Sequence, residues 1–193
     1  MERNNVMYRT MQSVLTTRDG EKNEAPVIEG YFAVFDSNYD MGYGMSESVA
    51  PGAFSETLAG DVRALIDHDT RLVLGRTTAH TLELREDSHG LWGKIYINQK
   101  DSEAMNLYER VKRGDVSQCS FGFEILSEET TFPADGEIHW RITKVKLYEV
   151  SCCTYPAYEE TGISARKKDR EQIEKRKSEA WKSTLLKKLK GEK

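Results

Sequence analysis

Short stretches in which apolar and polar residues alternate recur along the chain, and this pattern predicts β-strands. We expect strands at residues 6–17, 26–35, 62–66, 72–75, 81–85, 91–98, 116–126 and 138–155. Gly, Asn, Asp and Ser separate most of them, as turns between strands require. The last stretch is too long for one regular strand and its apolar phase changes, so we expect a bulge near Thr143.

Other stretches have the pattern of helices and loops. Apolar residues share one helical face over residues 101–113, and Gly114 is the expected stop. Residues 51–60 are expected to form a shorter helix, and residues 36–49, rich in Gly, Ser, Asn and Asp, a long loop. We therefore expect a fold that is mainly β with some α, of the α+β class.

Composition indicates one domain followed by a polar tail. The chain has 193 residues, of which 38% are hydrophobic and 31% charged, which suits one core of moderate size. We place the domain at residues 1–163 and the tail at residues 164–193. Three cysteines, two of them adjacent, are a poor disulfide framework, and no apolar run suits a membrane span or a signal peptide. We expect a protein that is kept inside a cell.

Charge is distributed unevenly between the two parts. Residues 166–193 contain twelve Lys or Arg against five Asp or Glu, a net charge of +7, while the rest of the chain carries −11. An acidic body is a poor surface for nucleic acid, because phosphates need positive charge. Trp181, Leu185 and Leu189 would line one face of a partly helical tail. We expect this tail to tether the protein to an acidic partner; a solvated tail without a role is the alternative.

One histidine lies where a catalytic base would be useful. His68 follows the predicted strand 62–66 and is flanked by two aspartates. An imidazole at the end of a strand lies at the rim of the sheet, within reach of a substrate, and can take up a proton. A solvated turn histidine is the alternative. His80 and His89 are expected to have no chemical role.

Two further residues have suitable chemistry to act with His68. Ser120 lies in the middle of the predicted strand 116–126, and Gly122 on the same face would leave space above the hydroxyl for a substrate. The phase of the last strand places Glu149 on its apolar side, where a carboxylate needs a partner such as a histidine. The alternatives are a small polar residue in a sheet for Ser120 and, for Glu149, a bulge that returns it to solvent.

Four segments carry a resemblance to a known family. They are PGAF at residues 51–54, ALIDHDTRLVLGRT around His68, KRGDVSQCSFGF around Ser120 and LYEVSCCTYPAY around Glu149. Together, over residues 8–160, they resemble the prohead maturation proteases of tailed bacteriophages and, more distantly, assemblin, the herpesvirus capsid maturation protease. The resemblance implies His68 as the catalytic histidine, Ser120 as the nucleophile and Glu149 in place of the second histidine of assemblins.

The resemblance also implies a fold and a function. The fold is a closed or partly closed antiparallel β-barrel of the herpesvirus-protease type, with short surrounding helices and a C-terminal helical tail. The function is that of a Ser-His-Glu serine endopeptidase that cleaves the major capsid protein, the scaffold protein or both, and itself. It would act in the host cytoplasm, within the assembling procapsid, without cofactor, metal or membrane. A homodimer is one alternative for the oligomeric state, and an inactive assembly module of the same fold is the alternative function.

Other chemistry at the site stays open. Asp67 and Asp69 are alternatives to Glu149 as the acid, and a metal-dependent hydrolase would use both aspartates with His68 and His139. The absence of a paired-histidine spacing weakens the metal alternative.

The nucleophile and the oxyanion site have alternatives as well. Cys119 is a competing nucleophile, although its strand phase points it away from Ser120. Assemblins use arginines just beyond the strand that corresponds to residues 138–155, and the stretch Thr154–Tyr158 has none. Backbone N–H groups near Ser120 are candidates for the oxyanion site, as are three side chains: Arg63, Arg71 and Arg76.

Overall fold

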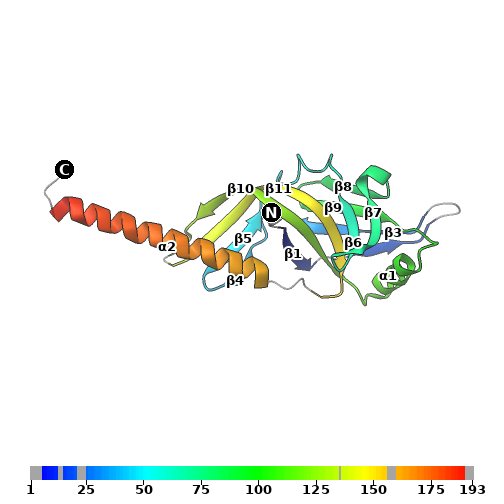
Figure 1. The fold of residues 1–193 in the computed structure, drawn as a ribbon. Coiled ribbons are helices and arrows are strands. Elements are labelled where there is room, and N and C mark those ends of the chain that lie inside the picture. The colour runs from blue at the N-terminus through cyan, green and yellow to red at the C-terminus, as the bar shows by residue number, and fades with distance from the viewer. Residues whose placement is uncertain (1–5, 13–14, 21–24, 135, 156–159, 190–193) are drawn as a thin grey trace. The chain divides into compact units, whose positions relative to one another are not determined.

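The computed structural model describes residues 6–12, 15–20, 25–134, 136–155 and 160–189 (Figure 1). The chain divides into two compact units, Met1–Glu159 and Glu160–Lys193, whereas the composition predicted a division after residue 163. The described residues of the first unit lie mainly in strands, and those of the second form a helix. The expected α+β class is confirmed.

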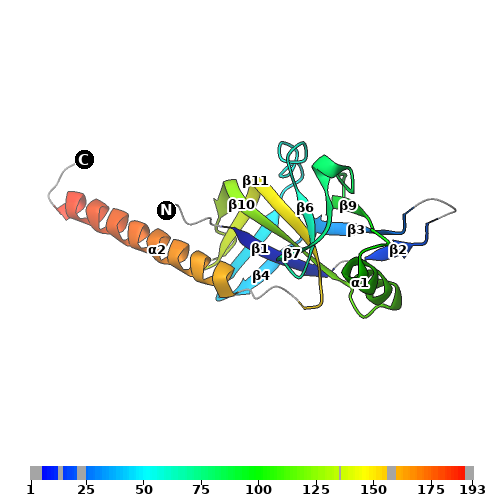
Figure 2. The same ribbon diagram turned by 45° about the vertical axis from the view of Figure 1, so that its right-hand side comes forward.

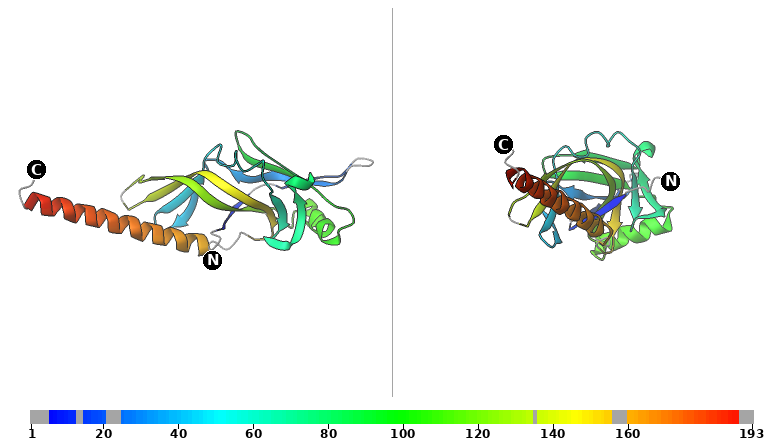
Figure 3. Two further views of the ribbon diagram at one scale, coloured as in Figure 1. Left: turned by 45° about the horizontal axis from the view of Figure 1, so that its top comes forward. Right: turned by 60° about the vertical axis from the view of Figure 1, so that its left-hand side comes forward.

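The described strands of the first unit form two sheets (Figures 2 and 3). Its elements are β1 (Met7–Gln12), β2 (Thr16–Arg18), β3 (Val27–Val34), β4 (Tyr39–Gly42), β5 (Met45–Val49), β6 (Arg63–Ile66), β7 (Asp69–Arg76), the 3-10 helix η1 (Thr77–Ala79), β8 (Leu82–Glu86), β9 (Gly90–Tyr96), α1 (Ser102–Arg113), β10 (Gln118–Thr131) and β11 (Ile138–Cys153). One sheet has the order β1-β10-β11-β5-β4, with β6 on β11 and β7 on β6; the other has the order β2-β3-β9-β8. The pairings among the described strands form no closed barrel, so the herpesvirus-type barrel is not confirmed.

The long strand β11 joins the parts of the larger sheet. Along one edge it pairs antiparallel with β10. Along the other edge, residues 138–142 run parallel to β5 and residues 149–152 run parallel to β6. The end of β6 is thereby placed beside the end of β11, and the turn that follows β6 comes to lie there.

The apolar core contains side chains from both sheets. Phe121 and Phe123 of β10 stack with their ring centroids 4.7 Å apart, and Phe54 meets Phe121 edge-on at 5.5 Å. Successive residues of a strand face opposite sides of the sheet. Burial of these phenylalanines therefore turns Ser120 and Gly122 to the other face, as the sequence pattern predicted.

Several predicted elements are present close to their expected bounds. The strands on either side of His68, the hairpin β8–β9 and the helix α1 are all found. The Asp101 side chain caps α1 by accepting hydrogen bonds from the Glu103 and Ala104 amides, and Gly114, with a φ of +85°, ends the helix. Local sequence signals were sufficient for these elements.

Three local predictions were wrong. Residues 6–17 contain two strands, β1 and β2, which belong to different sheets. Residues 36–49 contain the hairpin β4–β5, whose turn uses the positive φ of Gly42, Tyr43 and Gly44. This hairpin depends on the pairing of β5 with β11, a long-range contact that overrides the loop-like composition.

The third error concerns residues 51–60, which form successive turns and no helix. The Ser55 amide donates to Gly52 O, and the Thr57 amide donates to Phe54 O, so these hydrogen bonds join residues three positions apart. Gly52 has a φ of +86°. A right-handed helix cannot contain this conformation, and the expected helix therefore cannot start there.

The strand β11 is irregular, as predicted. Its pairing with β10 skips Thr143, where the bulge was expected, and also Tyr148. Each skipped residue reverses the inward and outward phase of the strand. The second irregularity decides where Glu149 lies.

The second unit contains α2 (Glu160–Leu189), a longer helix than the partly helical tail that we expected. Arg170 Nε donates to Glu174 Oε1 at 2.9 Å, one turn along the helix. Trp181 and Leu185 are exposed, and the side chain of Leu189 lies outside the described part. No helix among the described residues is long and apolar enough to cross a membrane.

Candidate active site

The turn between β6 and β7 holds His68 in an uncommon backbone conformation. Asp67 and His68 have φ values of +46° and +62°, in the left-handed region that residues other than glycine rarely adopt. The Asp67 carboxylate accepts hydrogen bonds from the amide of Thr154 at 2.8 Å and from its hydroxyl at 3.2 Å. The Asp67 amide donates to Cys152 O at 3.1 Å. These contacts attach the turn to the end of β11.

The imidazole of His68 is paired with a carboxylate. His68 Nδ1 lies 2.7 Å from Glu149 Oε1, and the exposed fractions of the two side chains are 16% and 9%. An ionised carboxylate can only accept hydrogen bonds, so Nδ1 carries the proton. The neutral ring then has its lone pair on Nε2, as a general base requires.

The irregularity at Tyr148 determines the face on which Glu149 lies. The alternation of residues predicted that Glu149 would lie on the apolar side of the strand, together with Leu147. In the structure Leu147 pairs with a core-facing residue of β10, whereas Glu149 is opposite Gly122. Directly opposite residues share a face, so the prediction was wrong: Glu149 lies on the face that carries Ser120.

Ser120 lies on this face but is not hydrogen-bonded to His68. It is fully buried, and its hydroxyl donates to the carbonyl of Arg9 in β1 at 2.9 Å. The residue opposite Ser120 on β11 is Ser151. The Ser151 hydroxyl donates to Glu149 Oε2 at 2.5 Å and accepts from the His68 amide at 3.2 Å. The residue directly opposite Ser120 is thus hydrogen-bonded to both the histidine and the carboxylate.

The space above Gly122 is filled by protein groups. A Cβ atom at this position would collide with Glu149 Oε1 and would lie 2.9 Å from Cε1 of Tyr8. The Tyr8 ring also packs against His68, with the ring centroids 4.4 Å apart. Burial and the negative charge of Glu149 raise the pKa of Tyr8. We predicted that this space would admit a substrate; it admits the carboxylate and the Tyr8 ring.

Sequence reasoning missed Cys153. Its Sγ lies 3.8 Å from His68 Nε2, the nitrogen that faces away from Glu149. Cys153 shares the strand phase of Glu149 and Ser151, and this phase is the signal that could have found it. Burial, followed by the charges of Asp67 and Glu149, raises the pKa of the thiol. A thiol that stays protonated is a poor nucleophile.

The two aspartates beside His68 bind other groups. Asp69 Oδ2 lies 2.7 Å from Arg71 Nη2, and the hydrogen bonds from Arg71 lower the pKa of Asp69 to about 2. Asp67 binds Thr154. Of the three candidate acids, Glu149 is the one whose carboxylate contacts the imidazole.

His139 and Cys119 have partners elsewhere. His139 Nδ1 lies 2.8 Å from Ser46 Oγ, and its Nε2 lies 2.9 Å from Ser48 Oγ. The Cys119 thiol donates to Tyr31 O at 3.0 Å, on the core side of β10. The described part of the chain contains no group of three or more His, Cys, Asp or Glu residues placed to hold a metal ion. The residues of the metal alternative are therefore not brought together.

The arginines considered for the oxyanion site are held by carboxylates. Arg63 and Arg76 contact Asp61 at 3.2 and 2.6 Å, and Arg71 contacts its neighbouring aspartate. These contacts lend no support to an oxyanion role. Residues 156–158, in the stretch without arginine, lie outside the described residues.

Known proteins are similar to this chain in sequence or structure. The family model described as caudovirus prohead serine protease matches residues 13–176. The chain belongs to this family. The prohead protease of Enterobacteria phage HK97 is 31% identical over 155 residues, and the match covers 78% of this chain and 63% of that protein. The solved structure of the bacteriophage T4 capsid assembly protease, gp21, aligns with a TM-score of 0.44 and 10% identity over 77% of this chain and 99% of that chain. The family-level resemblance found in the motifs is confirmed.

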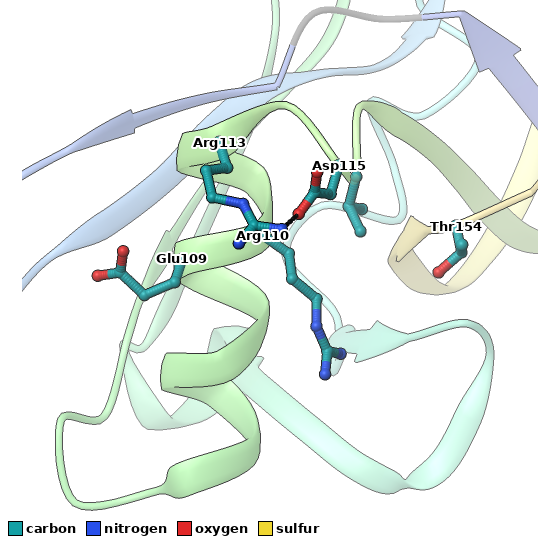
Figure 4. Close-up of a pocket in the computed structure, with 6 residues that line it drawn as sticks. Glu109, Arg110, Arg113, Asp115 and Thr154 are labelled. Carbon is teal, nitrogen blue, oxygen red and sulfur yellow. Dashed lines mark hydrogen bonds and ion pairs between the residues drawn. The ribbon is translucent and has the colours of Figure 1, made fainter.

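In this member of the prohead protease family, a cavity of about 410 Å³ lies between α1 and Thr154 (Figure 4). It is lined by Glu109, Arg110, Arg113, Asp115, Val116 and Thr154. Arg113 is paired with Asp115, while the Arg110 side chain extends between α1 and Thr154 (Figure 4). Thr154 also binds Asp67, which places the cavity beside the turn.

Proposed function

We propose that this chain is a serine endopeptidase that cleaves the capsid protein, the scaffold protein or both during procapsid maturation, and also itself. The observation that carries the proposal is the hydrogen bond between His68 Nδ1 and Glu149 Oε1 on the sheet face of Ser120. A serine, a histidine and a carboxylate in this relation have the composition of a catalytic triad. Family membership and the name of the HK97 relative, prohead protease, support the substrate class.

In this proposal Ser120 is the nucleophile. Its hydroxyl donates to Arg9 O, so catalysis needs a rotation about the Cα–Cβ bond toward His68 Nε2. Catalytic hydrogen bonds often form only when the substrate binds. His68 then takes the hydroxyl proton as Oγ attacks the scissile carbonyl, and it gives this proton to the departing amine. A water molecule, deprotonated by the same nitrogen, hydrolyses the acyl-enzyme and regenerates Ser120.

Glu149 has the role of the orienting acid. It keeps the proton on His68 Nδ1 and stabilises the imidazolium that forms when Nε2 takes up a second proton. Assemblins use a histidine at this place, and a carboxylate supplies a full negative charge instead. We also propose that this fold is related to the β-barrel of the assemblins.

We also propose that α2 tethers the protease inside the assembling procapsid, in the host cytoplasm. Residues 166–193 have a net charge of +7 and exposed apolar side chains at Trp181, Leu185 and Leu186. An acidic capsid or scaffold surface fits this combination, and tethering raises the local protease concentration. Deletion of residues 165–193 should leave cleavage of a short peptide unchanged and reduce incorporation into particles. Normal incorporation of the truncated chain would refute the tether.

Co-expression with the capsid protein of the same phage tests the function. The wild-type chain should shorten the capsid protein or itself, and mass spectrometry of the fragments should show this. Ser120→Ala should leave both intact, while Cys119→Ala, adjacent in sequence but facing the core, should retain cleavage. Cleavage by Ser120→Ala rejects the serine mechanism. Intact proteins with the wild-type chain favour the inactive assembly module.

A further inference from the structure

Ser151 makes hydrogen bonds to two members of this site, His68 and Glu149. It is fully buried in β11, opposite Ser120 on β10 and Leu65 on β6. Its hydroxyl donates to Glu149 Oε2 at 2.5 Å and accepts from the His68 amide at 3.2 Å. The other carboxylate oxygen of Glu149 contacts His68 Nδ1 at 2.7 Å. Imidazole, carboxylate, hydroxyl and the His68 backbone therefore form a closed ring of hydrogen bonds.

The first consequence concerns the Glu149 carboxylate. A buried charged group without hydrogen-bond donors is costly. Here each oxygen has its own donor, His68 at Oε1 and Ser151 at Oε2. A carboxylate bonded at both oxygens has a fixed plane. Ser151 therefore determines the direction from which Oε1 meets the imidazole.

The second consequence concerns the backbone of the turn. Residues in the left-handed region persist only where surrounding contacts hold them there. The His68 amide is held by Ser151 Oγ, and the preceding amide, that of Asp67, is held by Cys152 O. A single hydroxyl thus fixes both the carboxylate and the backbone that carries the imidazole.

We propose that Ser151 is a positioning residue that acts through Glu149 and His68 and does not touch the substrate. The inference rests on the proposed function where it treats His68 as the base; the hydrogen bonds themselves do not depend on activity. Removing the hydroxyl should lower kcat with little change in KM, because the substrate-binding surface is untouched. The expected loss is on the order of 10- to 100-fold, the size expected for one hydrogen bond to a charged group.

The matched variants are Ser151→Thr and Ser151→Val. They add the same bulk to a buried position, and only threonine keeps the hydroxyl. Using the full chain and a peptide that spans a cleavage site mapped in the capsid protein, the threonine variant should have a kcat close to that of the wild type. The valine variant should have the lowered kcat, and Ser151→Ala should have a lowered kcat without any added bulk. Equal kcat values for the threonine and valine variants would overturn the proposal.

Proton NMR gives a readout that does not require cleavage. The Nδ1 proton of a histidine bonded to a carboxylate resonates far downfield. This signal should be present in the wild type, Ser120→Ala and Ser151→Thr. Exchange with solvent should weaken it in Ser151→Val and Ser151→Ala, and thermal unfolding should show that both variants are folded. If the Ser151→Val variant does not fold, Ser151→Ala is compared with the wild type instead. If the wild-type chain cleaves no protein but the variants show these NMR differences, the protease function is rejected and the positioning role of Ser151 is supported. If the signal is unchanged in the folded Ser151→Ala variant, the positioning role of Ser151 is rejected.

Discussion

Two histidines lie at opposite ends of β11 and have different partners. His139, near the start of the strand, has a serine hydroxyl of β5 on each ring nitrogen, at 2.8 and 2.9 Å. His68, beside the end of the strand, has the Glu149 carboxylate on Nδ1 at 2.7 Å, and among the described residues the Cys153 thiol is the hydrogen-bonding group near Nε2, at 3.8 Å. Both rings are half-buried. The difference is in the chemistry of the partners.

The partners determine what each ring can do. A hydroxyl both donates and accepts, so two hydroxyls satisfy a neutral imidazole at both nitrogens. No nitrogen of His139 is left to take a proton from a substrate. A carboxylate only accepts hydrogen bonds, which fixes the proton of His68 on Nδ1. A thiol forms weak hydrogen bonds and its contact with Nε2 is long, so the lone pair of Nε2 can bond to another donor instead. The same residue type is structural at one end and suited to catalysis at the other.

The largest expected effect separates the two histidines directly. His68→Ala should lower kcat by a thousandfold or more, because members of a triad fail together. His139→Ala should keep kcat within a few-fold and reduce the free energy of unfolding by about 1–3 kcal/mol, through the serine groups that it leaves unpaired. Peptide cleavage and thermal unfolding of both variants are the measurements. Similar losses of kcat in the two variants would remove the distinction.

The next effect tests the carboxylate that makes His68 different. Glu149→Gln should lower kcat by up to about ten-thousandfold, because an amide can favour the wrong tautomer of the imidazole. Asp69→Asn is the matched control, since Asp69 is adjacent to His68 but bound to Arg71, and it should stay within a few-fold of the wild type. If Asp69→Asn is the damaging change and Glu149→Gln is harmless, the acid has been assigned to the wrong residue.

Gly122→Ala tests how tightly the carboxylate is held. The added Cβ collides with Glu149 Oε1 and approaches the Tyr8 ring. Overpacking of this kind costs about 1–3 kcal/mol of stability, and displacement of the carboxylate should also lower kcat. Both quantities should fall together, in unfolding and peptide-cleavage measurements. Wild-type kcat in a folded Gly122→Ala variant would show that the Glu149 position is not critical.

The smallest effect concerns the thiol near Nε2. Cys153→Ala should keep kcat within a few-fold. Burial and nearby carboxylates raise the pKa of Cys153, so the thiol is protonated at neutral pH. Raising the pH past about 8.5, where an ordinary thiol ionises, should not accelerate alkylation of Cys153 by iodoacetamide, as mass spectrometry of the labelled peptide can show. Rapid alkylation with loss of activity, absent in Cys153→Ala, would point to a cysteine mechanism.

The sequence was informative where the signal is local. Alternation in residues 116–126 placed Ser120 and Gly122 on one face of the strand, and the turn after residues 62–66 marked His68. The end of α1 at Gly114 was visible for the same reason. Each of these depends on residues within a few positions of one another.

What could not be predicted depends on register between distant strands. The irregularity at Tyr148 reverses the phase of β11 and so brings Glu149, Ser151 and Cys153 to the face of Ser120. No pattern within β11 shows which residue its partner strand skips. The contact of the Ser120 hydroxyl with Arg9 likewise depends on the pairing of β1 with β10, between segments that lie far apart in the sequence.

The central claim is that Ser120 is a serine activated by His68. The direct measurement is covalent labelling of the full chain with a fluorophosphonate, which reacts with activated serines, followed by peptide mapping by mass spectrometry. The account predicts an adduct on Ser120 in the wild type, His139→Ala and Cys153→Ala, and none in His68→Ala over the same time. An adduct on Ser151 in place of Ser120, or equal labelling of Ser120 with and without His68, would contradict it.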